Sequence, residues 1–299
     1  MRADSSPQGI RRLRPPTVRE LSVLAVGVGV LLCAGDRVPT GDPPGPPPAA
    51  RAGPVEPAVP RPVIVPRERW LDGEVRAQPK AKYAQRVVAV IVHHTDSPNT
   101  YDCADAPFLI RNLRTGHTGY QGWDDIGYNF LIDRCGTIYE GRAGGTDRPV
   151  VGAHSQGFNR GTAGVAVLGT FTAGNEVPQA VENALARLVA WKLSLSHTDP
   201  SSTVRLVSTN DNARYPAGTA ATLPALAGHE DGYQTSCPGR ALYERLPFIR
   251  RAASRIQQEA ALAHRPVKEA AHPRGPVKEA AAGVSGPPRG APPPPPAHR

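Results

Sequence analysis

The chain has 299 residues, of which 34 are prolines, and these prolines lie mostly at its two ends. Residues 1–66 hold 14 of them and residues 264–299 hold 10, so the middle has ordinary proline usage and can bury one core. The prolines show no Gly-X-Y period, which excludes collagen. The formal net charge is +9, but residues 1–35 and 261–299 carry most of the excess. This distribution argues against a nucleic-acid partner and fits a weakly basic surface near an anionic cell wall or lipid headgroups.

The first 35 residues have the pattern of an export signal. Five arginines precede an apolar run from Leu21 to Gly35. As a helix this run would span about 22 Å, short of the ~30 Å hydrocarbon core of a membrane. A basic region, a short apolar region and small residues at its end predict a signal peptide over residues 1–35, cut after Gly35. An uncleaved N-terminal anchor is the alternative, and it would be the only part of the chain to contact a membrane.

Three further segments follow. Residues 36–66 are a Pro-rich linker, because repeated prolines exclude helix interiors and central strands. Residues 67–260 form the predicted domain. Residues 261–299 are a Pro- and Ala-rich tail, in which Pro-Val-Lys-Glu-Ala-Ala occurs at 266–271 and again at 276–281. Two copies are too few for a solenoid, so the tail is interpreted as a solvated or wall-spanning spacer.

The predicted domain mixes strands with helices. Residues 86–92 and 161–170 are apolar runs typical of strands buried on both faces. Residues 127–133 alternate and lead through a turn into 137–140, which predicts a hairpin. Helices are expected over about 105–116, 178–195 and 239–262, the last interrupted at Pro247. Together these patterns predict an α/β domain.

The cysteine count points to one thiol with a separate role. Removal of the signal peptide takes Cys33 away and leaves Cys103, Cys135 and Cys237. An odd number of cysteines in an oxidising compartment implies a disulfide and one further thiol.

Histidines stand where a metal site could form. His93 and His94 close the first predicted strand, His154 follows Val-Gly-Ala, and His229 stands eight residues before Cys237. A cysteine bound to zinc as a thiolate would be protected and neutralised outside the cell. These residues alone leave two alternatives open: the histidines are structural, and Cys237 pairs with one of the other cysteines.

Several motifs in series resemble the peptidoglycan recognition protein family and its relatives, the type-2 N-acetylmuramoyl-L-alanine amidases. They are His-His-Thr at 93–95, Gly-Trp-Asp-Asp-Ile-Gly-Tyr-Asn-Phe at 122–130, Gly-Thr-Ile-Tyr-Glu-Gly-Arg at 136–142, Val-Gly-Ala-His at 151–154 with Asn159, and Gly-His at 228–229 with Cys-Pro at 237–238. The resemblance covers about residues 67–250, and several motifs in order are more specific than any one. It is nearest to the secreted actinobacterial branch, which shares the positions of Cys103 and Cys135 and an extra segment at about 199–227. It implies a mixed central β-sheet flanked by about three helices.

The resemblance implies a zinc hydrolase. It assigns Zn2+ to His93, His229 and Cys237, with water in the fourth place, and three protein ligands with an open position are typical of a catalytic zinc. The implied reaction is cleavage of the amide between N-acetylmuramic acid and L-alanine of the peptidoglycan stem peptide. Zinc lowers the pKa of its bound water towards about 7 and polarises the carbonyl.

Two further residues are implied as catalytic. Tyr128 and Thr235 match positions whose hydroxyls can donate hydrogen bonds to the oxyanion. No glutamate matches the general base of more distant amidases, so Tyr128 and His154 are both candidates for the group that takes the proton of water. A peptidoglycan-binding module with little or no activity is the alternative, although members that only bind the wall usually lack the residue that matches Cys237.

The resemblance also assigns a substrate groove and a disulfide. The residues implied to bind the muramyl peptide are His117, Gln121, Gly122, Trp123, Arg142, His154 and Asn159. In the family, Gly-Trp at 122–123 together with Arg142 goes with diaminopimelate-type stems, because a guanidinium pairs in a bidentate manner with the carboxylate that lysine lacks. Cys103 and Cys135 are then left to form a disulfide that ties the first helix to the hairpin. We expect a secreted, cell-wall-associated monomer whose partner is peptidoglycan.

Overall fold

A computed structural model describes residues 59–71, 73 and 79–264. The predicted export signal lies outside the described residues, as do most of the linker and nearly all of the tail, so these segments stay predictions. The first described element, β1 (Ile64–Val65), lies just before the predicted start of the domain at residue 67. The last, α4 (Arg240–Ala263), runs three residues past its predicted end at residue 260. No helix within the described part of the chain is both long and apolar enough to cross a membrane.

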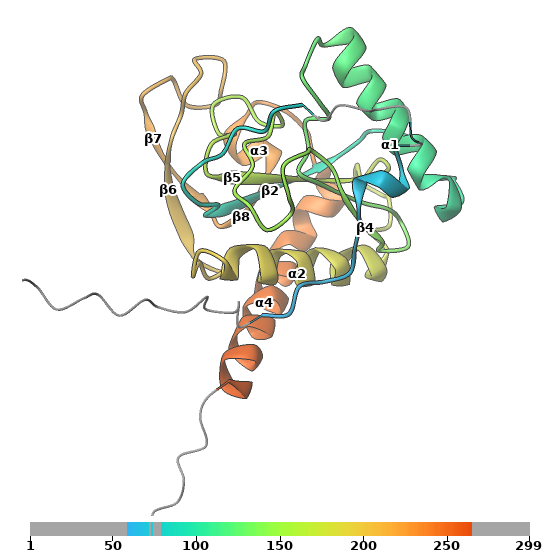
Figure 1. Cartoon of the computed structure of the whole chain (residues 1–299). Helices are drawn as coiled ribbons and strands as arrows, with labels where there is room; N and C mark the ends of the chain where they lie inside the picture. The colour runs from blue at the N-terminus through green and yellow to red at the C-terminus, as the bar shows by residue number, and fades with distance from the viewer. Residues whose placement is uncertain (1–58, 72, 74–78, 265–299) are drawn as a thin grey trace, which may run out of the picture. The chain divides into compact units, whose positions relative to one another are not determined.

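A six-stranded mixed sheet forms the centre of the fold (Figure 1). Its strand order is β1-β4-β3-β5-β2-β8. β3, β5, β2 and β8 run parallel to one another, whereas β4 is antiparallel to β3 and pairs in parallel with β1. The remaining strands of this sheet are β2 (Ala89–His94), β3 (Phe130–Ile132), β4 (Ile138–Glu140), β5 (Thr162–Val167) and β8 (Leu226–Gly228). The expected hairpin is β3 with β4, and the two expected buried strands, β2 and β5, lie side by side.

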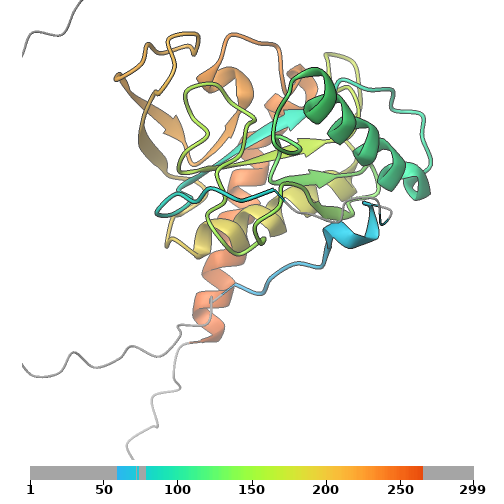
Figure 2. The same cartoon turned by 45° about the horizontal axis from the view of Figure 1, so that its top comes forward.

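Different elements cover the two faces of the sheet, because successive strand residues point to opposite faces. On one face, Val90, Val92 and Phe130 pack in a single core with α2 and α4. On the other, Leu131 packs under α1, and Ile91 packs under the β6–β7 hairpin. These covering elements are α1 (Ala106–Thr115), α2 (Gln179–Ser194), β6 (Thr203–Val207) and β7 (Ala220–Pro224). Figure 2 shows α1 and the hairpin on either side of the central strands. The predicted mixed α/β fold with about three flanking helices is confirmed.

α4 continues through Pro247, so the predicted interruption of this helix is wrong. A proline inside a helix removes one backbone hydrogen bond and costs about 3 kcal/mol. Leu242 and Leu246 before the proline, and Ile249 and Ala253 after it, are all buried in the core shared with α2. Burial of apolar side chains on both sides of Pro247 offsets the cost, which the local sequence pattern does not reveal.

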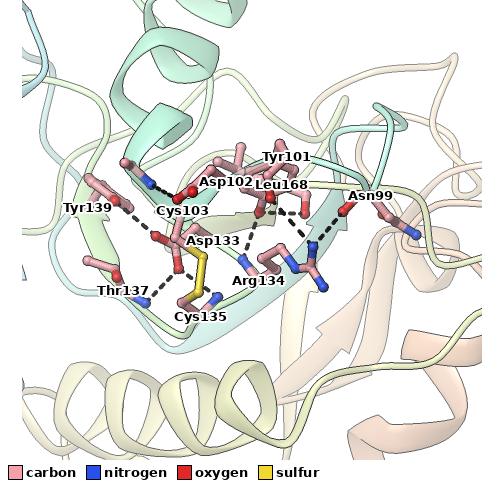
Figure 3. Close-up of a disulfide and its surroundings, with 11 residues drawn as sticks. Asn99, Tyr101, Asp102, Cys103, Asp133, Arg134, Cys135, Thr137, Tyr139 and Leu168 are labelled. Carbon is pink, nitrogen blue, oxygen red and sulfur yellow. Dashed lines mark hydrogen bonds between the residues drawn. A yellow bond between two sulfur atoms is a disulfide. The ribbon is translucent and has the colours of Figure 1, made fainter.

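The predicted disulfide between Cys103 and Cys135 is present, with the two Cα atoms 6.3 Å apart (Figure 3). Cys103 begins the short turn η2 (Cys103–Asp105) just before α1, and Cys135 lies in the turn between β3 and β4. The carboxylate of Asp133 fixes the same turn, because it accepts hydrogen bonds from the backbone N–H groups of Cys135 and Thr137 and from the hydroxyl of Tyr139. The start of α1 is therefore tied to the central hairpin.

Candidate metal centre and substrate groove

Two parallel strands bring His93 and His229 together. In the register of β2 and β8, Val92 pairs with Gly228, and each histidine is the next residue along its chain segment. The carboxyl ends of parallel strands meet at one edge of a sheet, where functional groups commonly gather. The two imidazole rings lie 4.4 Å apart between centroids. His229 opens the short turn α3 (His229–Gly232), in which Asp231 accepts hydrogen bonds from the Gly228 N–H at 2.8 Å and from the Tyr243 hydroxyl at 2.7 Å.

Cys237 completes a group of three ligand atoms. Its Sγ lies 3.7 Å from Nδ1 of His93, and one nitrogen of each histidine lies within 4.8 Å of this sulfur and of the other nitrogen. The backbone N–H of His94 points at the same sulfur from 3.4 Å. The hydroxyl of Thr235 accepts a hydrogen bond from the N–H of Cys237 at 3.2 Å, which fixes the backbone of the cysteine. Among the described cysteines, Cys237 is the one outside a disulfide.

The protonation states of this group suit zinc. Burial, and then the neighbouring His229, lower the pKa of His93 well below its ordinary value, and burial lowers the pKa of His229 to about 4. Both imidazoles are therefore neutral at pH 7 and can present a lone pair. Burial raises the pKa of the Cys237 thiol to about 12, so its thiolate needs a cation beside it. Two neutral imidazoles and one thiol are a donor set that zinc binds with an open position. The residues present fit a zinc ion.

The second nitrogen of His93 is also engaged. Its Nε2 lies 3.1 Å from Nδ1 of His154, and Nε2 of His154 lies 3.3 Å from the hydroxyl of Thr162. His154 is 7% exposed, and its pKa is lowered to about 3 by burial first and then by His229 and Arg142. A line of polar groups thus leads from the candidate metal ligands into the interior of the protein.

His94 points to the opposite face of β2. Its Nδ1 accepts the backbone N–H of Phe171 at 3.2 Å, within the part of the core that lies towards α2 and α4. Its backbone touches Cys237, but its ring is not part of the group of three ligand atoms.

Tyr128 stands next to the candidate metal ligands. Its ring centroid lies 5.1 Å from that of His93. Burial raises the pKa of its phenol, and the negative charge of a Cys237 thiolate raises it further, so Tyr128 keeps its proton at neutral pH and acts as a donor. Thr235, the other predicted catalytic residue, contacts Cys237 through its hydroxyl and is not among the residues that line the groove described next.

A groove of about 500 Å³ opens beside this group. Four segments line it, and the lining residues include five that the sequence singled out: Trp123, Tyr128, His154, Asn159 and His229. A larger cavity of about 680 Å³ lies between the start of α2 and the start of α4, but it holds none of the predicted site residues. The predicted site therefore coincides with a groove, although not with the largest cavity among the described residues.

Asn159 shapes the wall of the groove. Its side-chain oxygen accepts the backbone N–H groups of His154 at 2.8 Å and of Ser155 at 2.9 Å, so it holds the turn that carries His154. Asn159 therefore both lines the groove and holds the turn that carries His154.

Of the remaining predicted substrate residues, His117, Gln121 and Gly122 lie in or just after a π-helical turn, η3 (Gly116–Tyr120), which follows α1. Arg142 lies two residues after the end of β4. Nδ1 of His117 accepts the N–H of Gly127 at 3.1 Å, and its ring lies 4.7 Å from that of Trp123. Arg142 is half-buried and donates from Nη1 to the carbonyl of Ile126 at 3.1 Å, so it is not a freely solvated charge. Gln121 and Gly122 are exposed beside Trp123, and Gly122 has a left-handed φ of 64°.

A buried ionic network supports this side of the groove. The carboxylate of Asp125, which is fully buried, accepts Arg67 at 3.1 Å, Arg114 at 3.3 Å and the backbone N–H of Ala143 at 2.9 Å. Arg67 comes from the turn η1 (Arg67–Arg69), and Arg114 from α1. The network ties the segment of Asp125 to the turn η1, to α1 and to Ala143.

Sequence reasoning missed several residues of the site. Asn210 and Asn212, in the connection between β6 and β7, line the groove, as does Tyr233. An Asn-Asp-Asn run predicts a turn, but only the packing of the hairpin beside the groove gives that turn a place in the site. Thr162 was missed because a threonine at the start of a buried strand is ordinary in composition.

Known proteins resemble this chain over the region that carries the site. In a comparison with protein families, residues 83–240, just over half of the chain, match the N-acetylmuramoyl-L-alanine amidase family. The N-acetylmuramoyl-L-alanine amidase of Homo sapiens is 34% identical over 187 residues, which are 62% of this chain and 28% of the human protein. Peptidoglycan-recognition protein LE of Drosophila melanogaster is 37% identical over 134 residues, which are 42% of this chain and 35% of that protein. The chain thus matches only about a third or less of the length of these relatives.

Solved structures are also similar to this chain. The structure of wild-type Drosophila PGRP-LB has 25% sequence identity and a TM-score of 0.48, and the match covers 62% of this chain and 92% of that one. Peptidoglycan recognition protein-LE in complex with tracheal cytotoxin, a monomeric diaminopimelic acid-type peptidoglycan, has 29% identity and a TM-score of 0.47, with the same two coverages.

Proposed function

We propose that this chain, which belongs to the N-acetylmuramoyl-L-alanine amidase family, is a zinc-dependent hydrolase of peptidoglycan. The bond cleaved is the amide between N-acetylmuramic acid and L-alanine of the stem peptide. The observation that carries the proposal is the convergence of His93, His229 and Cys237 beside a groove that Tyr128 lines. A wall-binding module would need the groove, but it would not need three ligand atoms at one point.

The chain's own residues supply two hydrogen-bond donors for the reacting carbonyl. Zinc, when bound, supplies a Lewis acid that polarises the amide carbonyl and lowers the pKa of water. Tyr128 keeps its proton and donates a hydrogen bond to the carbonyl oxygen as negative charge develops there; loss of one such donor costs about 10²–10³ in rate. The Thr235 hydroxyl accepts from Cys237, which leaves its own hydrogen available as a second donor.

We assign the stem-peptide preference to Arg142, together with Gly122 and Trp123. A guanidinium carries five N–H donors, and Arg142 uses one of them on the Ile126 carbonyl. The half-buried position reduces solvent screening of its charge, which favours pairing with the extra carboxylate of diaminopimelate. The expected result is faster release from diaminopimelate-type than from lysine-type peptidoglycan, and Arg142→Ala should remove most of that difference. Equal rates on both substrates with the wild-type chain would contradict this assignment.

The activity is tested by incubating the purified, zinc-loaded chain with diaminopimelate-type peptidoglycan. The product to measure is stem peptide with a free L-alanine amine, quantified by mass spectrometry. Cys237→Ala should abolish both zinc binding and release. His94→Asn is the matched control, because its amide oxygen can still accept the Phe171 N–H on the other face of β2, and it should keep both. Zinc binding without release would reject the amidase and leave a wall-binding module.

We further propose that the protein is exported through residues 1–35 and acts as a monomer at the cell wall, and that it belongs to the secreted actinobacterial branch. The basic C-terminal segment, residues 261–299, supports attraction to an anionic wall after the signal peptide is removed. Mass measurement of the secreted protein tests cleavage after Gly35, and light scattering in solution tests the monomer. The segment at about 199–227, which the resemblance links to this branch, contains β6, β7 and the connection between them, which contributes Asn210 and Asn212 to the groove.

A further inference from the structure

We propose that Thr162 and His154 are positioning residues that fix the tautomer of His93, so that its Nδ1 presents a lone pair to the metal. This inference rests on the proposed zinc site. It concerns a chain of three hydrogen bonds that begins at a backbone carbonyl and ends at a metal ligand. The direction of each bond follows from the one before it.

The first bond fixes the hydroxyl of Thr162. Its Oγ1 lies 2.5 Å from the carbonyl oxygen of Phe158 and 3.5 Å from that of Asn159. A carbonyl only accepts, so the single hydrogen of the hydroxyl points to one of these oxygens. The hydroxyl can then only accept from the third neighbour, Nε2 of His154 at 3.3 Å. His154 must therefore carry its hydrogen on Nε2.

The hydrogen bond between His154 and His93 then determines which nitrogen of His93 carries hydrogen. A neutral imidazole with its hydrogen on Nε2 has a lone pair on Nδ1. Nδ1 of His154 lies 3.1 Å from Nε2 of His93, so Nε2 of His93 donates. The lone pair of His93 is left on Nδ1, the atom that lies 3.7 Å from Sγ of Cys237. Outer hydrogen bonds of this kind orient metal-binding histidines and raise their basicity.

The ring of His154 packs closely against two glycines. A Cβ added at Gly164 would lie 2.3 Å from Cγ of His154, and one added at Gly152 would lie 2.6 Å from its Cδ2. Both glycines therefore leave space for this ring. Thr162 sits in β5, paired with Ala89 of β2, so the threonine and His93 belong to one rigid pair of strands. This packing holds His154 in one orientation, as the chain of hydrogen bonds from Thr162 to His93 requires.

One consequence concerns the proposed reaction. With Nδ1 accepting from His93 and Nε2 donating to Thr162, both nitrogens of His154 are used inside the protein. His154 then serves neither as the proton acceptor for water nor as a hydrogen-bonding partner of the substrate. It contributes the surface of its ring to the groove.

Metal affinity of the full chain tests the proposal. Thr162→Val removes the hydroxyl while it keeps the shape, and it should weaken zinc binding about 10–100-fold in competition with a chelator. Thr162→Ser restores the hydroxyl and should restore the affinity. Thr146→Val is the matched control: Thr146 is also buried, and its hydroxyl accepts from Arg61 away from the site. Zinc affinity of Thr162→Val equal to that of the wild type would overturn the proposal.

A spectroscopic readout separates this proposal from the zinc proposal. In the metal-free chain with 15N-labelled histidine, long-range 1H–15N spectra report which nitrogen of each ring carries hydrogen. We expect Nε2–H for both His93 and His154, and a mixture of tautomers for His93 in Thr162→Val. Nδ1–H on His93 in the wild type would refute this chain of hydrogen bonds. A wild-type chain that shows the expected tautomers but binds no zinc would instead refute the zinc site.

Discussion

Two buried polar networks hold the two sides of the groove, and they differ in charge. Beneath the candidate metal ligands, His93, His154 and Thr162 form a line of neutral groups. On the other side, two guanidinium groups, Arg67 and Arg114, share the carboxylate of Asp125. Both networks join segments that are far apart in the sequence, and the central side chains of the two networks, His154 and Asp125, are buried.

The difference in charge determines what each network does. In the neutral line, each group fixes the direction of the next hydrogen bond, so a change at Thr162 alters the tautomer of His93. In the ionic network, every charge depends on its partners, because burial of an unpaired charge is costly. Burial already lowers the pKa of Arg67 despite the opposing effect of Asp125. We therefore expect the neutral network to govern metal affinity and the ionic network to govern stability.

The largest expected effect is on the ionic side. Asp125→Ala leaves two arginines without their shared partner and should lower the free energy of unfolding by about 3–5 kcal/mol, measured in urea. Asp124→Ala is the control, since Asp124 is exposed, and it should change stability by less than about 0.5 kcal/mol. Similar stabilities for the two variants would contradict the assigned role of the network.

Loss of the disulfide between Cys103 and Cys135 should give the second-largest decrease in stability. Its residues are 32 apart in the sequence, and replacing both Cys103 and Cys135 by serine should lower stability by about 3–4 kcal/mol, because the unfolded chain gains freedom. Zinc affinity of the folded variant should match that of the wild type, since neither cysteine contacts the candidate ligands. A parallel loss of zinc affinity would show that α1 and the metal centre are coupled.

A third buried cation gives a pH-dependent effect. Lys192 donates to the carbonyls of Thr146 and Arg148, and burial lowers its pKa from 10.5 to about 8. Between these values the unfolded chain holds a proton that the folded chain has released, so stability increases with pH. The contribution is complete above pH 10.5 and is lost as the pH falls through about 8.

Lys192→Met isolates this contribution. From pH 8 to pH 10.5, the stability of the wild type relative to this variant should increase by about 3 kcal/mol. Urea unfolding of both proteins at several pH values gives the comparison. A difference that does not change with pH would mean that Lys192 titrates normally in the folded state.

The smallest expected change in stability is on the neutral side. Gly164→Ala places a methyl group against the ring of His154 and should cost about 1–3 kcal/mol through overpacking. It should also weaken zinc binding, because the displaced ring no longer accepts from His93. Gly119→Ala, where the added Cβ meets nothing within 4 Å, should change neither quantity. Unchanged zinc affinity in Gly164→Ala would separate the ring position of His154 from the metal centre.

Local patterns in the sequence predicted much of this structure. Apolar runs placed β2 and β5, alternation placed the β3–β4 hairpin, and the resemblance predicted the disulfide between Cys103 and Cys135. The motifs also named His93, His229 and Cys237, which the structure brings to one point. These features can be predicted from the sequence because side-chain periodicity and short motifs are properties of neighbouring residues.

Only the tertiary structure decided the rest. α4 continues through Pro247 because its buried residues pack against α2 on both sides of the proline. Arg67 reaches Asp125 across 58 residues, and His93 reaches His154 across 61. The directions of the hydrogen bonds that end at His93 depend on the carbonyl oxygen of Phe158 near Thr162. The contact of Thr162 with His154, and of His154 with His93, depends on how distant segments pack around the sheet. No local pattern encodes these contacts, because they depend on the packing of the whole domain.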